Sequence, residues 1–100
     1  MDITALFFLK VAFTRAREAD DVDQQGSLAR EIGVFYHEEA TRERATASDD
    51  DIHSLLSQAE HYLRISQTCF IETGDPARLY WSKGLHGAVK FDSGHYGDGI

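Results

Sequence analysis

The fold is decided by residues 48–76, SDDDIHSLLSQAEHYLRISQTCFIETGDP. From Ile52 to Phe70 the apolar side chains recur every three or four positions, so at about 100° per residue they form one continuous stripe along a helix. Ser48 comes directly before three acids, a pattern typical of a helix N-terminus. Gly74 can take the left-handed conformation that ends a helix, and Asp75-Pro76 can start the next one. The stretch therefore predicts a long helix, a tight turn and the beginning of another helix.

The rest of the chain predicts further helices. One runs from Leu28 to about Arg44, with Ser27 as its cap. Gly33 inside it costs about 1 kcal/mol relative to alanine, so its presence indicates a close approach between helices. Residues 76 to about 89 predict another helix, whose candidates for the inward face are Leu79, Tyr80, Leu85 and Ala88.

The first segment, residues 3–13, is apolar around most of its circumference. Asp2 stands where a secretion signal would carry positive charge, and Lys10 interrupts an apolar run that is too short to cross a bilayer. We therefore expect a helix that must be covered on several sides, either at the centre of the bundle or by a second copy in a homodimer. The candidate contacts for a homodimer are Ile3, Leu6, Phe7 and Phe13.

Length and composition indicate one domain. The chain has 100 residues, of which 42% are hydrophobic, enough for one core but not for two. We expect an all-α bundle of three long helices and a shorter fourth, in a single domain over residues 1–90. Residues 91–100, FDSGHYGDGI, are rich in glycine and predict an irregular, flexible tail.

Charge and cysteine content narrow the classes of function. The net charge of −7 repels a phosphate backbone and argues against direct nucleic-acid binding. Cys69 is the only cysteine and falls in the apolar stripe, so we expect a buried thiol in a cytoplasmic protein. The histidines have no strong metal-ligand context, and the phosphate-loop, dinucleotide-binding and serine-hydrolase motifs are missing from the sequence. We expect no metal, no cofactor and no membrane partner.

These observations favour a non-enzymatic protein-binding module. A stoichiometric, phage-type inhibitor or adaptor could use carboxylates to cover a basic, nucleic-acid-binding surface of a larger protein, because carboxylates can occupy sites meant for phosphates. A homodimeric assembly element is a further hypothesis. The candidate partner-binding residues are Asp20, Asp21, Asp23, Glu38, Glu39, Asp49, Asp50 and Asp51.

An enzymatic alternative begins with Arg30 and His37, which lie nearly two turns apart on a side of their predicted helix that we expect to face solvent. A cation and an imidazole there could share one phosphate. The spacing, arginine followed by histidine after six residues, resembles the RNase motif of the HEPN family. Residues 59–90 are also similar in rhythm to the helical hairpins of HEPN and tetratricopeptide proteins. The resemblance implies a homodimeric helical RNase that uses Arg30 and His37, although Glu31 stands where that motif usually has Asn, Asp or His.

Overall fold

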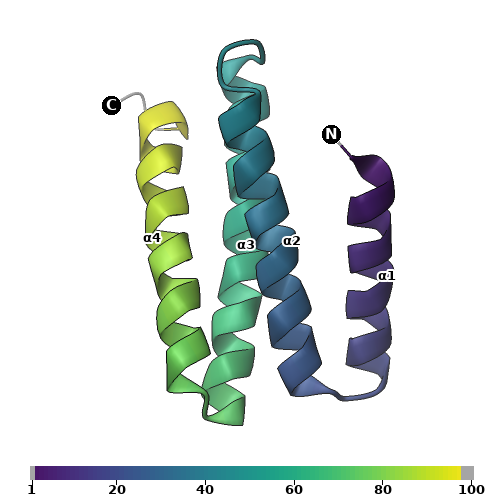
Figure 1. Ribbon diagram of the computed structural model, residues 1–100. Helices are drawn as coiled ribbons and strands as arrows, with labels where there is room; N and C mark the ends of the chain where they lie inside the picture. Colours follow the sequence, from purple (N-terminus) through teal and green to yellow (C-terminus); the bar gives the residue numbers. More distant parts are fainter. Residues whose placement is uncertain (1, 98–100) are drawn as a thin grey trace.

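Four helices make up the described part of the chain, and no strand occurs between residues 2 and 97. The structure is a computed structural model that describes the backbone of residues 2–97 and the side chains of residues 2–94. The helices are α1 (Ile3–Glu18), α2 (Val22–Arg42), α3 (Asp49–Thr73) and α4 (Pro76–Gly97). Figure 1 shows them running up and down beside one another. The predicted all-α bundle is confirmed.

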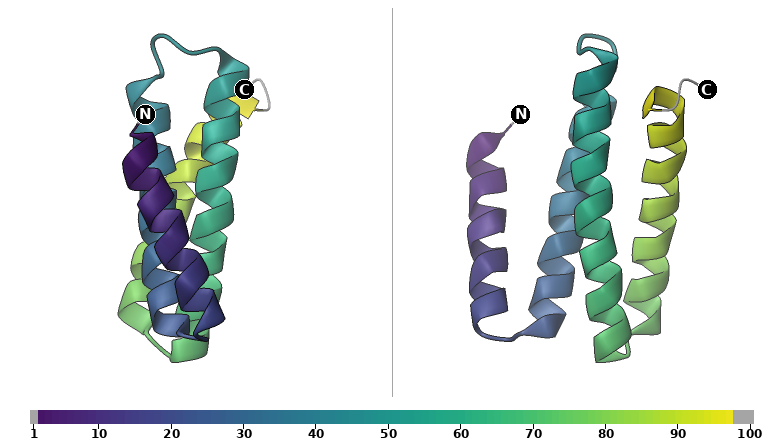
Figure 2. Two further views of the ribbon diagram at one scale, coloured as in Figure 1. Left: turned by 90° about the vertical axis from the view of Figure 1, so that its right-hand side faces the viewer. Right: turned by 180° about the vertical axis from the view of Figure 1, so that it is seen from behind.

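The bundle is built on α3, which packs against both α2 and α4, while α1 packs on α2. Figures 1 and 2 place α1 at one edge of the molecule and α4 at the opposite edge. The Cα atoms extend over 39 × 29 × 16 Å, so the bundle is flat. Within the described chain, α1 and α4 therefore each have an outer face that no other helix covers.

The core lies mainly between α2 and α3. The stripe predicted from Ile52 to Phe70 is its centre, and each fully buried Leu or Ile contributes about 1.5–3 kcal/mol relative to an exposed position. The buried cluster consists of Leu6, Phe13, Ala29, Ile32, Tyr36, Ala40, Ile52, Leu56, Ala59, Leu63 and Val89.

Hydrogen bonds start and end the helices of the hairpin as the sequence predicts. Ser48 Oγ accepts a bond from the backbone N–H of Asp51 at 3.1 Å, and Gly74 ends α3 in the left-handed conformation with φ 70°. Asp75 Oδ1 then accepts a bond from the backbone N–H of Arg78 at 3.1 Å. These contacts satisfy backbone groups that have no partner within a helix, and so they fix the tight turn between α3 and α4.

The start of α2 differs from the prediction. The helix begins at Val22, where the Asp21 carboxylate accepts a bond from the backbone N–H of Gln24 at 3.1 Å. Ser27 is therefore not the cap. Asp and Ser are both good caps, so local chemistry does not choose between them.

Two glycines let α2 approach α3 closely. A Cβ atom at Gly26 would lie 2.8 Å from Phe70 Cε1, and one at Gly33 would lie 2.7 Å from Leu63 Cγ. Real Cβ atoms do not come so close to a ring or a branched side chain without a shift in one of them. The close helix–helix approach predicted from Gly33 is confirmed.

α1 lies at the edge of the bundle and not at its centre. Its inner face is anchored by Leu6 and Phe13, which are buried and so cannot serve as the homodimer contacts predicted for them. Lys10 Nζ lies 5.4 Å above the ring centroid of Tyr36, and its hydrogen bond with that residue raises the pKa of Lys10. The outer face of α1 is apolar but uncovered, which explains why the sequence shows no clear polar side.

α4 is longer than the sequence predicts. It has 22 residues, against 16 in α1, and continues past Val89 to Gly97. The remaining part of the predicted tail, residues 98–100, lies outside the described residues. None of the helices between residues 2 and 97 combines the length and apolar character that crossing a membrane requires.

Candidate functional site

The predicted acidic residues do not gather into one surface. One group, at the turn between α1 and α2, consists of Asp20, Asp21 and Asp23. The other begins α3 at the opposite end of the bundle and consists of Asp49, Asp50 and Asp51 (Figure 1). Glu38 is exposed near the C-terminal end of α2, at the end of the bundle where α3 begins. The structure therefore presents two acidic groups separated by most of the length of the molecule.

Glu39 does not belong to the predicted acidic surface. Its side chain is only 2% exposed, and its carboxylate binds Arg42 Nη1 at 2.6 Å. It lies on the buried side of α2, so it cannot present charge to a partner. A buried carboxylate with a bound guanidinium has a structural role at this end of the helix.

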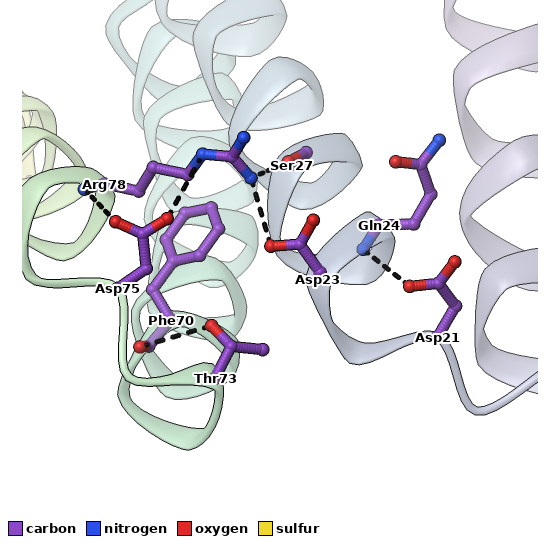
Figure 3. A network of polar contacts seen from close by, with 8 residues as sticks. All are labelled: Asp21, Asp23, Gln24, Ser27, Phe70, Thr73, Asp75 and Arg78. Carbon is purple, nitrogen blue, oxygen red and sulfur yellow. Dashed lines mark hydrogen bonds and ion pairs between the residues drawn. The ribbon is translucent and has the colours of Figure 1, made fainter.

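In the acidic group at the turn between α1 and α2, Asp23 already forms an ion pair within the chain. Figure 3 shows Arg78 of α4 reaching across to α2, where its Nη1 binds Asp23 Oδ1 at 3.1 Å and Ser27 Oγ at 3.2 Å. The same guanidinium lies 3.4 Å from Asp75 Oδ2 through its Nε. Arg78 thereby connects the beginnings of α2 and α4, and Asp23 neutralises part of its charge.

We call the contact region between α2 and α4 the seam. Farther along it from Arg78, Arg30 is covered by an aromatic ring. Its guanidinium carbon lies 3.8 Å from the ring centroid of Trp81, a close cation–π contact. Arg30 Nε is buried and has no hydrogen-bond partner among the described residues. Burial lowers the pKa of Arg30, opposed by the negative charge of Glu31 and reinforced by Arg78.

His37 lies in this seam as well, and the expectation that it faces open solvent is wrong. Its Nε2 lies 2.9 Å from Asp92 Oδ2, and its side chain is 23% exposed. Arg44 Nη2 lies 3.6 Å from the same carboxylate oxygen. The sequence could not show this contact because Asp92 belongs to α4, which covers the polar side of α2.

The outer face of α4 carries a group of exposed aromatic residues. Tyr80 is 81% exposed, Trp81 55% and Phe91 77%. Tyr80 and Ala88 were predicted to point inward, and both predictions are wrong because Ser82 and Val89 form the buried side of α4. Small exposed residues separate the aromatic ones on the same face, and we call the whole set the α4 face. The α4 face consists of Ala77, Tyr80, Trp81, Gly84, Gly87, Ala88 and Phe91.

Two lysines border the α4 face on one side. Lys83 and Lys90 are exposed and make no hydrogen bond or ion pair with any described residue. The only acid within α4 is Asp92, which turns toward His37. In a chain with a net charge of −7, this side of the molecule is locally positive.

His86 and Cys69 are both held within the bundle. His86 Nδ1 lies 2.8 Å from the Gln67 amide nitrogen and its Nε2 lies 3.3 Å from Glu60 Oε1, and these two contacts tie α4 to α3. Cys69 is buried as predicted, and burial raises the pKa of its thiol. In the part of the chain that the structure describes, no group of three or more His, Cys, Asp or Glu residues could hold a metal ion.

Comparison with known proteins gives no relative. No family model, curated protein or solved structure matches the chain. The sequence shows that residues 80, 84, 87 and 91 share one side of a helix, but it does not show that this side is left uncovered.

Proposed function

We propose that the chain is a non-enzymatic protein-binding module and that its α4 face receives one helix of a different protein. The observation that carries the proposal is the exposure of Tyr80, Trp81 and Phe91 on one side of a single helix. Exposed aromatic residues grouped in this way are typical of the anchors that supply most of the binding energy in protein interfaces.

The small residues of the α4 face favour a helix as the ligand. A Cβ atom built at Gly84 or Gly87 would meet nothing within 4 Å, so neither glycine is needed for packing inside the chain. Each costs about 1 kcal/mol of helix stability relative to alanine. Residues without a side chain between exposed aromatic residues allow the backbone of another helix to approach closely, which gives these glycines a reason to be present.

The charge at the border of the α4 face specifies the chemistry of the partner. Lys83 and Lys90 favour a helix that carries acids beside its apolar stripe. A second copy of α4 is disfavoured, because a two-fold antiparallel pair would bring the lysines of both copies to the same side of the interface. The proposed ligand is therefore an amphipathic helix with an acidic border.

Trp81 is held in place before any partner binds. The Arg30 guanidinium lies against one face of its ring at 3.8 Å, while just over half of the side chain stays exposed. Ordering a mobile interface side chain on binding costs about 0.5–1.5 kcal/mol of free energy. A side chain that is already ordered avoids part of this cost. This contact supports Trp81 as the central anchor of the α4 face.

The hypothesis of a phage-type inhibitor that covers a basic, nucleic-acid-binding surface stays a prediction. Because the two acidic groups lie at opposite ends of the bundle, such an inhibitor would contact its target through two small acidic surfaces and not through one continuous surface. Asp49, Asp50 and Asp51 are exposed and are its best remaining candidates. Reversing Asp49 and Asp50 to Lys should weaken such binding and reduce its salt dependence.

The RNase alternative has less support from the geometry. Arg30 stacks on Trp81 and His37 contacts Asp92, so both groups already have partners in the seam. Its test is cleavage of varied RNAs by the purified protein. Cleavage that is lost in His37→Ala would favour the enzyme and count against the proposed binding module.

The proposed binding mode is tested by capture of proteins from native host lysate with nuclease present, followed by affinity measurements on the purified partner. The variant Tyr80→Ser/Phe91→Ser removes two anchors, and Ile71→Ser removes a side chain that is similarly exposed, at 64%, but lies on α3. We expect the double variant to lose the partner and the Ile71 variant to keep it. A partner retained equally by all three proteins would show that the α4 face is not the binding site.

A further inference from the structure

We infer that the outer face of α1 binds a second copy of this chain, with the two α1 helices antiparallel. The inference concerns a different surface from the α4 face and does not depend on the proposed function. The α1 outer face consists of Ile3, Thr4, Phe7, Phe8, Val11, Arg15 and Glu18, which lie on the side of α1 opposite Leu6 and Phe13.

This face is apolar where it is most exposed. Ile3, Phe7 and Phe8 are 72%, 61% and 65% exposed, and no other helix of the described chain covers them. Taking roughly 200 Å² for each full side chain, these three leave about 400 Å² of apolar surface open to water. A contiguous patch of that size is at the scale that marks interaction sites on monomeric proteins.

Antiparallel pairing gives the charged residues of the face suitable partners. With Val11 of each copy at the two-fold axis, Arg15 of one copy lies over Phe7 of the other, where it can form a cation–π contact. Glu18 of one copy then lies beside Thr4 of the other, close to the positive end of that helix. Arg15 and Glu18 make no ion pair within residues 2–94, so both are available for these contacts.

A parallel pair would lose these contacts. It would place Arg15 against Arg15 of the second copy and Glu18 against Glu18, and like charges at facing positions are destabilising. The distribution of charge along α1 therefore selects the antiparallel arrangement.

The available area sets the strength of the dimer. A standard stable interface buries about 800 Å² on each partner, and the three apolar side chains supply about half of that. The remaining residues of the α1 outer face add further area along a helix of 16 residues, about 24 Å long. We expect a reversible dimer that forms with increasing concentration, not an obligate one.

The first test is the mass of the purified full chain as a function of concentration, by sedimentation equilibrium. The mass should rise from 11.2 kDa toward twice that value. The variant Phe7→Ser/Phe8→Ser should raise the dissociation constant at least about tenfold, because anchor residues dominate such interfaces. Tyr80→Ser/Phe91→Ser is the matched control and should dimerise like the wild type.

The second test fixes the geometry by disulfide formation between copies, in a Cys69→Ala background that removes the native thiol. Val11→Cys should cross-link readily, because residue 11 faces itself across the two-fold axis and the Cα atoms of a disulfide lie about 4.4–6.8 Å apart. Thr4→Cys should not cross-link, because residue 4 faces residue 18 of the other copy.

Three results would overturn the inference: a monomer at the highest attainable concentration, a dimer that survives loss of Phe7 and Phe8, or equal cross-linking at residues 4 and 11. The last would indicate a parallel pair. None of these results would affect binding at the α4 face, so failure of this inference can be distinguished from failure of the proposed function.

Discussion

The exchange of single glycines for alanine should change stability in opposite directions at two positions of this chain. Gly84 lies within α4, and a Cβ atom there would meet nothing within 4 Å. Only the helix preference then changes, and it favours alanine by about 1 kcal/mol. We expect Gly84→Ala to raise the free energy of unfolding by about that amount.

Gly33→Ala receives the same gain in helix preference but must fit a new methyl group into the packed contact between α2 and α3. Its Cβ would lie 2.7 Å from Leu63 Cγ and 3.2 Å from the Ala59 carbonyl oxygen. Leu63 is 1% exposed, and the carbonyl belongs to a helix backbone, so neither can move freely. Overpacking of this kind costs about 1–3 kcal/mol, which leaves Gly33→Ala less stable than the wild type by up to about 2 kcal/mol.

The assay is urea unfolding followed by circular dichroism, with thermal unfolding as a second readout. A change of 1 kcal/mol in a domain of this size shifts Tm by about 4–8 °C. The helix preference cancels between the two variants, so their difference in stability measures the steric cost at Gly33 alone. Equal shifts of both variants in the same direction would refute the reasoning, because they would show that α2 and α3 are not in close contact there.

Further predictions concern buried polar groups and the connection between α2 and α4. Ser82 Oγ is buried without a hydrogen-bond partner among the described residues, so Ser82→Ala should stabilise the chain by about 1 kcal/mol in urea unfolding. Ser66→Ala is its control and should show no such gain, because Ser66 Oγ donates to the Leu63 carbonyl at 2.8 Å. Burial raises the pKa of Cys69 above its ordinary value of 9.0, so a thiol reagent should react slowly with the folded chain and rapidly in denaturant. Because the unfolded thiol ionises first, stability should fall as the pH rises above that ordinary value, and Cys69→Ala should remove this dependence. Arg78→Ala should lower the free energy of unfolding by less than about 1 kcal/mol, with a smaller loss at high salt, because the guanidinium that binds Asp23 is 45% exposed.

The parts of the fold that follow local rules could be predicted from the sequence. Ser48 and Gly74 bound α3 through contacts with residues three or four positions away, and such contacts are encoded in the segment itself. Gly33 indicated a close packing contact because a glycine within a helix needs a compensating reason. For Ser48 and Gly74 the whole cause lies within the segment, whereas for Gly33 the sequence indicates a contact but not its partner, Leu63.

The candidate surfaces could not be predicted as well, because they depend on which helix covers which face. His37 lies on the polar side of α2, yet Asp92, 55 positions farther along the chain, covers it. Tyr80 is apolar enough for the core, but α4 has apolar residues on two sides and buries the side with Ser82. The sequence predicts Ile3, Leu6, Phe7 and Phe13 together as possible dimer contacts, and only the structure separates exposed Phe7 from buried Leu6.

The positions of α1 and α4 at opposite edges of a flat bundle have a consequence for valency. A dimer formed through the outer faces of α1 would carry its two α4 helices at opposite ends of the assembly, because α1 and α4 lie at opposite edges of each copy. Such an assembly could bind two partner helices at once, on two molecules or on two sites of one larger protein. Linked binding of this kind can strengthen attachment by about 10²–10⁴ without any new contact at either site, provided that the spacing of the partner sites matches. The width of the bundle would then set the distance between the two binding sites, and only partners whose helices are spaced at that distance could bind to both.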